Sequence, residues 1–183
     1  VDSSVGGKTG VNLSAGKNLV GAFKQPAFVC ADTDVLATLP PREWACGCGE
    51  VAKTALIDGD EFFFWLSDQA PAMVDRRSDA VSEAIARCVV FKADVVAQDK
   101  TESRGVRECL NYGHTLAHAI EKLLGYGTYS HGHAVAEGMR FAACMGMRLA
   151  DMPAELAQAH GSVVEGFQSN QDGDLDEKIH ATH

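Results

Sequence analysis

The chain has 183 residues, of which 46% are hydrophobic and 22% charged, a composition typical of a globular domain with its own core. Lysine and arginine number 16 against 25 aspartates and glutamates, so the formal net charge is −9, which argues against general binding of nucleic acid or of anionic membranes. The sequence contains no apolar run of about 18 residues, the length that indicates a transmembrane helix. Its first ten residues, VDSSVGGKTG, also lack the basic and apolar regions of a secretory signal.

The front of the chain is predicted to be a short α/β remnant, residues 1–31. Residues 1–19 are rich in Gly, Ser and Lys and show no helical period, so we expect a loop there. The apolar run 27–31, directly after Pro26, predicts a buried strand. Residues 32–40 predict a turn followed by a short helical segment.

The remainder, residues 32–167, is predicted to be a helical domain, so the fold class is mainly α. Apolar periodicity, proline positions and glycine stops predict helices over 41–57, 60–68, 78–98, 107–124 and 132–150, with a polar loop at 99–106 and a shorter helix after Pro153. The tail 168–183 is polar and aperiodic, and we expect it to be disordered.

The six cysteines fit no compact disulfide framework and include no C-x-x-C pair. The prediction is therefore reduced thiols in a cytoplasmic protein. Cys46-Gly-Cys48 is the only close pair, and one C-x-C without a second pair is weak evidence for a metal site.

Four polar side chains share one face of the helix predicted over 107–124. Their spacing of 4, 3 and 4 residues aligns Arg107, Asn111, His114 and His118. Histidines at i and i+4 have the spacing of transition-metal ligands, although Thr115 stands where the zincin pattern needs a glutamate. Two histidines hydrogen-bonded within a polar interface remain the alternative.

Two further residues strengthen the metal hypothesis. A tight loop after the predicted helix can bring His131 back against it and so add a third imidazole. Glu50 lies among apolar neighbours, where a carboxylate needs a cation or metal as partner. Two histidines and one carboxylate leave coordination positions open, as a catalytic site requires.

The segment Val5-Gly-Gly-Lys-Thr-Gly10 has a partial likeness to a P-loop, but Asp2 stands where the motif needs its first glycine. An ATP-binding P-loop is therefore not predicted. Small residues still let the backbone approach an anion, and the chain has enough basic groups to hold a phosphate and a carboxylate: Lys8, Lys17, Lys53, Lys92 and Arg107. Each lysine alone has the simpler interpretation of a surface residue.

These segments together resemble the 3-dehydroquinate synthase family. The likeness lies in six strings that follow the family's order over about residues 1–150: DSSVGGKTGVN (2–12), GKNLVGAF (16–23), DTDVLATLP (32–40), EVAK (50–53), LNYGHTLAHAIE (110–121) and HGHAVAEGM (131–139).

The resemblance implies a role for each matching position. Divalent-metal ligands would be Glu50, His114 and His131, and the proton-transfer positions would be Glu102 and His118. Substrate contacts would be Asp2, Lys8, Asn18, Lys53, Lys92, Arg107 and Asn111. Contacts to NAD would be Lys17 and the segment Val35, Leu36, Ala37 and Thr38. Spacing alone places both His114 and His118 on the metal, whereas the resemblance leaves His118 free.

The resemblance also implies an activity: NAD- and zinc- or cobalt-dependent cyclisation of 3-deoxy-D-arabino-heptulosonate 7-phosphate to 3-dehydroquinate, with loss of phosphate, in the shikimate route. NAD would take and return a hydride, while the metal would acidify the hydroxyl being oxidised. A small-molecule substrate, a cytoplasmic location and a homodimer follow as family expectations, with no nucleic-acid or membrane partner.

The sequence departs from the family pattern at several places. His133 and Lys100 each stand where a glutamate is common, and an extra residue near Ser103 leaves the register of Glu102 open. The segment 46–49 before Glu50 is also unlike the family. Most of the family's N-terminal NAD-binding domain has no counterpart, so we expect this chain alone to bind NAD poorly.

Three alternatives stay open at this point. The chain could be another sugar-phosphate cyclase, such as a 2-deoxy-scyllo-inosose synthase, with the same metal and NAD chemistry. It could be a relative among the metal-dependent alcohol dehydrogenases, which would show net NADH production. It could also be a truncated, inactive fragment that folds as a helical interaction module, in which case Glu50, His114 and His131 would lie far apart.

Overall fold

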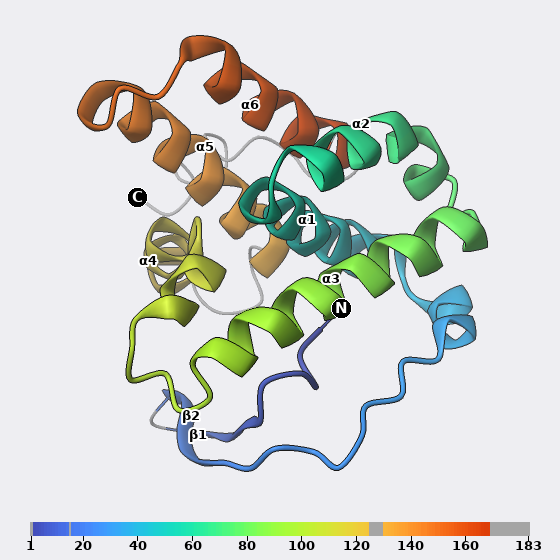
Figure 1. Ribbon diagram of the computed structural model, residues 1–183, viewed down its shortest axis with the longest axis vertical. Helices are drawn as coiled ribbons and strands as arrows, with labels where there is room; N and C mark the ends of the chain where they lie inside the picture. Colours follow the sequence, from blue (N-terminus) through green and yellow to red (C-terminus); the bar gives the residue numbers. More distant parts are fainter. Residues whose placement is uncertain (1, 15, 125–129, 169–183) are drawn as a thin grey trace.

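Helices make up most of the chain, as the apolar periodicity predicts. The computed structural model describes residues 2–14, 16–124 and 130–168 (Figure 1). The elements are strands β1 (Lys8–Leu13) and β2 (Gly16–Phe23), 3-10 helices η1 (Thr33–Thr38) and η2 (Val106–Asn111), and helices α1 (Pro41–Asp58), α2 (Asp60–Val74), α3 (Ser78–Gln98), α4 (His114–Leu124), α5 (His131–Leu149) and α6 (Ala154–Gln168).

Helix α1 lies in the middle of the helical assembly, where it packs against α2, α3, α5 and α6 (Figure 1). One apolar cluster joins α1, α2 and α3 and includes Phe62, Leu66 and Cys88, which are almost fully buried. A second cluster joins α4 and α5 around Val135 and Met139. Burial of these apolar side chains is the main stabilising contribution, and it fixes α1 between the two groups of helices.

Glycines allow α5 to approach its neighbours closely. A Cβ on Gly132 would lie 2.4 Å from the Cα of Cys46 in α1, and the N–H of Gly132 donates to the Sγ of Cys46 at 3.1 Å. A Cβ on Gly138 would lie only 1.8 Å from the carbonyl oxygen of Gly113, directly before α4. Helices α1, α4 and α5 can therefore converge, and each carries one of the predicted metal ligands.

The prediction for the front of the chain is wrong in its details. Residues 8–23, expected mostly as loop, form an antiparallel hairpin in which Lys8 pairs with Phe23 and Val11 with Val20. The segment 27–31, predicted as a buried strand, has no regular structure, and the side chain of Phe28 is 81% exposed. A strand needs a hydrogen-bonding neighbour, and no described strand pairs with residues 27–31.

The single helix predicted over 107–124 is also wrong, because the chain divides there into η2 and α4. Gly113 lies between them with φ of 78°, a left-handed conformation that glycine adopts without strain. Arg107 and Asn111 therefore do not share one α-helical face with His114 and His118. They reach the same place through the turn at Gly113.

The other predicted helices are confirmed with small shifts at their ends. α1 and α3 match the expected spans almost to the residue, and α2 continues beyond Asp68 to Val74. Gln168, expected in the tail, is the last residue of α6, and residues 169–183 lie outside the described part of the chain. Among the described helices, none is both long and apolar enough to cross a lipid bilayer.

Candidate metal centre and adjoining cavity

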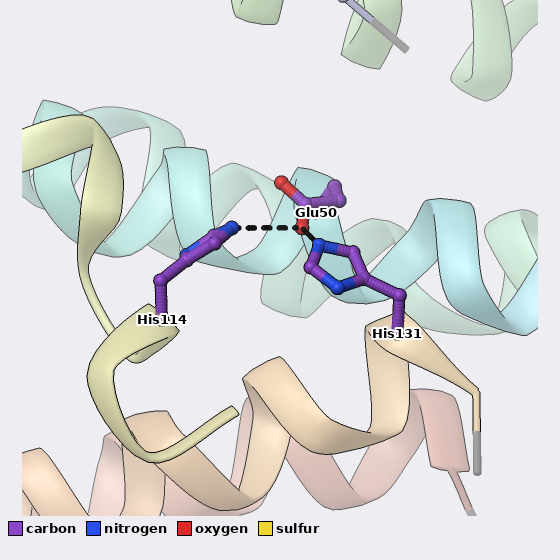
Figure 2. Close-up of side chains that lie close together, drawn as sticks. All are labelled: Glu50, His114 and His131. Atoms are coloured by element: carbon purple, nitrogen blue, oxygen red, sulfur yellow. Dashed lines mark ion pairs between the residues drawn. The ribbon is translucent and has the colours of Figure 1, made fainter. Parts of the chain in front are cut away.

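Three side chains from three helices meet in one place. Glu50 comes from α1, His114 is the first residue of α4, and His131 is the first residue of α5 (Figure 2). The Oε1 atom of Glu50 lies 3.8 Å from the Nε2 of His114 and 3.5 Å from the Nε2 of His131. One possible ligand atom from each residue lies within 4.8 Å of the other two. This convergence is the geometry that a three-ligand cation site requires.

The two carboxylate oxygens of Glu50 have different surroundings. Oε2 accepts a hydrogen bond from the Nζ of Lys53 at 2.7 Å, one turn further along α1. Oε1 is buried, faces the two imidazoles, and finds no hydrogen-bond donor among the described residues. A buried carboxylate oxygen without a donor is costly unless a cation approaches it. The residues present therefore fit a metal ion on the Oε1 side.

Each imidazole turns its Nε2 toward Glu50 and its Nδ1 toward an acceptor. The Nδ1 of His114 lies 3.2 Å from the backbone carbonyl oxygen of Tyr112. The Nδ1 of His131 lies 3.3 Å from the Oε1 of Glu121, a buried carboxylate on α4. A neutral imidazole that donates from Nδ1 leaves the Nε2 lone pair free to bind a metal.

The donor set is typical of a catalytic metal site. Two imidazoles and one carboxylate suit zinc and related divalent ions, and three protein ligands leave a position open for a substrate oxygen. Neither Cys46 nor Cys48 belongs to the group of converging ligand atoms. Burial raises the pKa of the Cys48 thiol to about 12, although Arg76 opposes this shift. That thiol is therefore held protonated and is a poor metal ligand at neutral pH.

His118 lies beside this group without joining it. Its ring centroid is 5.6 Å from that of His114 and 6.4 Å from that of His131, with which it is stacked. Of the two α4 histidines that the i, i+4 spacing aligns, His114 alone therefore belongs to the group of converging ligand atoms, which His131 and Glu50 complete.

A cavity of about 300 Å³ opens beside the three ligands. Its lining combines all three with seven of the nine side chains that the resemblance assigns to substrate contact or proton transfer, namely Asp2, Lys8, Lys53, Lys92, Glu102, Arg107 and Asn111, together with Ser3 and Leu110. These residues come from parts of the chain as far apart as residues 2 and 131. Four cationic side chains and three carboxylates line the cavity, so it has a small excess of positive charge within an acidic protein.

Ion pairs already connect several of the cavity residues. Lys8 pairs with Glu102, and the Nζ of Lys92 lies 3.3 Å from the Oδ1 of Asp2 and donates to its carbonyl oxygen at 2.8 Å. Glu102 has φ of 57°, an uncommon conformation for a residue with a side chain. The Glu102 side chain lies in the cavity lining, where Lys8 reaches it.

Arg107 connects the N-terminal segment to the helical domain. It is 3% exposed, and its Nη1 donates to the carbonyl oxygen of Gly6 at 3.4 Å. A Cβ on Gly6 would lie 2.9 Å from the Nη2 atom, so only glycine fits there without displacing the guanidinium. The Gly-rich segment thus holds Asp2 and Lys8 at the cavity by packing on Arg107.

The predicted NAD contacts are not part of this cavity. Val35, Leu36, Ala37 and Thr38 lie in η1, outside the cavity lining, and Val35 is 63% exposed. The side chains of Lys17 and Asn18 lie outside the described residues, so their predicted roles stay predictions. His133 is buried in the first turn of α5, where its Nδ1 contacts the Ser130 hydroxyl and not the cavity.

Acidification is expected to destabilise the metal-free protein in two steps. Burial lowers the pKa of His114 below its ordinary 6.5, although Glu50 opposes this shift. Burial raises the pKa of Glu50, but Lys53 and the two imidazoles outweigh it and bring the net value below 4.5. Both groups have a lower pKa in the folded protein than in the unfolded chain, so the unfolded chain binds the proton at a higher pH. The free energy of unfolding therefore falls as the pH drops below 6.5 for His114 and below 4.5 for Glu50.

The measurement is the urea midpoint as a function of pH in the presence of a chelator. His114→Gln should reduce the upper step, to which His160 also contributes because burial lowers its pKa, and should leave the lower step in place. A midpoint that rises between neutral pH and the ordinary pKa of Glu50 would contradict this assignment.

Comparison with known proteins agrees with the geometry. The family model described as 3-dehydroquinate synthase N-terminal matches residues 1–46, and the one described as 3-dehydroquinate synthase C-terminal matches residues 47–181. The two matches meet inside α1.

Curated relatives carry the same description. The chain is 55% identical over 149 residues to a 3-dehydroquinate synthase of Saccharophagus degradans, covering 81% of this chain and 41% of that protein. It is 47% identical over 156 residues to one of Shouchella clausii, covering 85% and 43% respectively. The chain therefore spans less than half the length of these relatives.

Solved structures of related cyclases share the fold. A 2-deoxy-scyllo-inosose synthase complexed with carbaglucose-6-phosphate, NAD⁺ and Co²⁺ is 35% identical, with a TM-score of 0.78 over 99% of this chain and 50% of that chain. A 2-epi-5-epi-valiolone synthase from Streptomyces hygroscopicus, 22% identical, superposes with a TM-score of 0.82 over 100% of this chain and 51% of its own. With two family models and relatives at about half identity in agreement, the chain belongs to the 3-dehydroquinate synthase family.

Proposed function

We propose that this chain carries the metal-binding and most of the substrate-binding part of a 3-dehydroquinate synthase. The reaction is the cyclisation of 3-deoxy-D-arabino-heptulosonate 7-phosphate to 3-dehydroquinate with release of phosphate. The observation that supports it most strongly is the convergence of Glu50, His114 and His131 beside a cavity lined by four cationic side chains. A divalent ion next to a basic cavity suits a substrate that carries a hydroxyl, a carboxylate and a phosphate.

The cationic side chains would bind the two anionic groups of the substrate. Lys53 lies beside the metal ligands because it pairs with Glu50, and Lys92 and Arg107 line the same cavity. Charge-assisted hydrogen bonds from these groups orient a carboxylate or phosphate. Asn111 and Asp2, which also line the cavity, would hydrogen-bond the hydroxyl groups between them.

Proton transfer would fall to Glu102 and His118. Glu102 lines the cavity, and its carboxylate is held by the Nζ of Lys8. The His118 ring lies within 5.6 Å of that of His114, so its imidazole can hold a proton next to the metal ligands. When bound, NAD would accept and return a hydride, and a zinc or cobalt ion would lower the pKa of the substrate hydroxyl.

The remaining parts of the proposal rest on the relatives. NAD would contact Lys17 and the segment Val35–Thr38. The 35%-identical synthase, solved with NAD⁺ bound, supports the choice of cofactor. We extend the proposal to a homodimer in the cytoplasm that acts on a small molecule. The six cysteines are all free thiols, which suits a reducing compartment.

The test is phosphate release from the heptulosonate phosphate by the 183-residue chain joined behind the N-terminal part of the Saccharophagus degradans relative, supplied with zinc and NAD. We expect phosphate and 3-dehydroquinate in equal amounts, without net NADH, and no turnover after chelation of the metal. A hybrid that binds zinc and NAD yet leaves the heptulosonate unchanged would contradict the proposal.

A second candidate is a different sugar-phosphate cyclase. The 2-deoxy-scyllo-inosose synthase matches 99% of this chain at 35% identity, so the same site could serve another sugar phosphate. The same hybrid assayed with glucose 6-phosphate separates the two, since its carba analogue is the ligand of that synthase. Turnover of glucose 6-phosphate in preference to the heptulosonate would favour the second candidate.

A further inference from the structure

Glu121 is a buried carboxylate that neither the spacing argument nor the implied role assignments include. It lies in the second turn of α4, seven residues after His114, and is 6% exposed. Its Oε1 lies 3.3 Å from the Nδ1 of His131, which belongs to a different helix. A carboxylate in this position needs a polar or cationic partner, and the geometry shows that one partner is an imidazole of the metal centre.

The two imidazoles of the centre are held in different ways. His114 has a side chain only 15% exposed, and its Nδ1 faces the backbone carbonyl oxygen of Tyr112. His131 is 39% exposed, so burial alone restricts its ring less. The carboxylate of Glu121 is the acceptor that faces the Nδ1 of His131, just as a backbone carbonyl faces the Nδ1 of His114.

Charge gives Glu121 a second effect. The Nζ of Lys53 lies 2.7 Å from the Oε2 of Glu50, so the cation largely offsets the charge of this carboxylate ligand. Two neutral imidazoles add nothing to this balance. The charges of Glu50, Lys53 and the two imidazoles therefore sum to about zero, which is a weak field for a divalent ion. The carboxylate of Glu121, behind His131, would supply the negative charge that this set lacks.

We propose that Glu121 is a positioning residue that holds His131 in the Nδ1–H tautomer, directs its Nε2 at the metal position, and supplies negative charge behind this ligand. The inference rests on the proposed metal site for its functional meaning. The tautomer of His131 can be measured without any metal. The role of Glu121 can therefore be tested independently of the proposed metal site.

The first experiment measures the tautomer in the metal-free 183-residue chain. Long-range ¹H–¹⁵N spectra at alkaline pH distinguish a protonated from an unprotonated ring nitrogen. His131 should carry its proton on Nδ1 in the parent chain and in Glu121→Gln, whose amide oxygen still accepts. In Glu121→Met, which has similar size but no acceptor, the proton should move largely to Nε2, while His114 stays unchanged as the internal reference.

The second experiment is a calorimetric zinc titration of the same chains. Loss of a carboxylate behind a metal-bound histidine typically weakens metal binding about 10- to 100-fold, and we expect a loss in this range for Glu121→Met. Glu121→Gln should lose less, because its amide oxygen can still accept from the Nδ1 of His131 and only the charge is gone. Glu137→Met is the matched control, since Glu137 pairs with Arg140 at 2.8 Å and lies outside the cavity lining.

Different results would contradict the role of Glu121 and the metal site. An unchanged His131 tautomer in Glu121→Met, or zinc affinity equal to that of Glu137→Met, would overturn the role of Glu121. No zinc binding by the parent chain would overturn the metal site itself, while the tautomer result would still decide whether Glu121 orients His131. If Glu121→Met does not fold, Glu121→Gln must still show weaker zinc binding with an unchanged tautomer.

Discussion

Replacing Glu50 with glutamine is expected to lower zinc affinity by more than about 100-fold, which exceeds the usual loss for an outer partner of a ligand. The Oε1 atom of Glu50 is the point at which the Nε2 atoms of His114 and His131 converge. Glutamine keeps the size of the side chain and an oxygen that can accept from Lys53. The substitution therefore removes the charge and the strong metal ligand without opening a cavity, and calorimetric titration measures the loss.

A control on the same helix makes this result specific. Glu43→Gln removes an equal charge from the exposed first turn of α1, outside the cavity lining, and zinc affinity should stay within about twofold of the parent, as expected for a solvent-screened charge. Thermal unfolding of both variants without metal checks that α1 is intact. Equal zinc binding by Glu50→Gln and the parent would show that Glu50 is not a ligand.

Replacing Gly138 with alanine is expected to have the largest effect on stability, a loss of at least about 3 kcal/mol. The new Cβ would lie 1.8 Å from the carbonyl oxygen of Gly113, which is backbone and cannot rotate away. Helices α4 and α5 would have to separate. Because His114 directly follows Gly113, zinc affinity should fall together with the free energy of unfolding, measured by urea denaturation.

The matched control is Gly47→Ala on α1. Apart from the neighbouring backbone of α1 itself, no atom of the described residues lies within 4 Å of the Cβ that this substitution would add. Alanine has a higher helix propensity than glycine, so the free energy of unfolding should rise by about 0.5–1 kcal/mol. Similar stabilities for the Gly138 and Gly47 variants would contradict the close crossing of α4 and α5.

The helices that the sequence predicted well are those with a strong local signal. Pro41 marks the start of α1, and the amphipathic run 78–98 coincides with α3. Local propensity and the burial of one helical face agree in these segments, so neighbouring parts of the fold do not override them.

The predictions that were wrong concern segments whose secondary structure depends on tertiary contacts. Strands β1 and β2 contain glycine and polar residues, and their identity depends on pairing with each other rather than on an apolar period. The division of 107–124 into η2 and α4 depends on the left-handed turn at Gly113, which the close approach of Gly138 requires. A glycine inside a helical pattern was a visible signal of this break.

The site was predictable by residue type but not by position in space. The periodicity of 107–124 identified His114 and a binding face. Glu50 lies 64 positions earlier, so its apolar neighbours made it a candidate ligand, and the resemblance assigned it to the same site as His114 and His131. Glu121 was missed, although His114, His118 and Glu121 follow the i, i+4, i+7 spacing of one helix face. The spacing shows that Glu121 shares a helix face with the two histidines, but its contact with His131 is visible only in the structure.

The most direct test of the metal centre is the X-ray absorption spectrum of the 183-residue chain loaded with one equivalent of zinc. If Glu50, His114 and His131 bind the ion, the spectrum will show only nitrogen and oxygen neighbours at about 2.0–2.2 Å, with the outer-shell scattering of imidazole. Sulfur at about 2.3 Å, the zinc–thiolate distance, would contradict this assignment and place the ion on the cysteines instead.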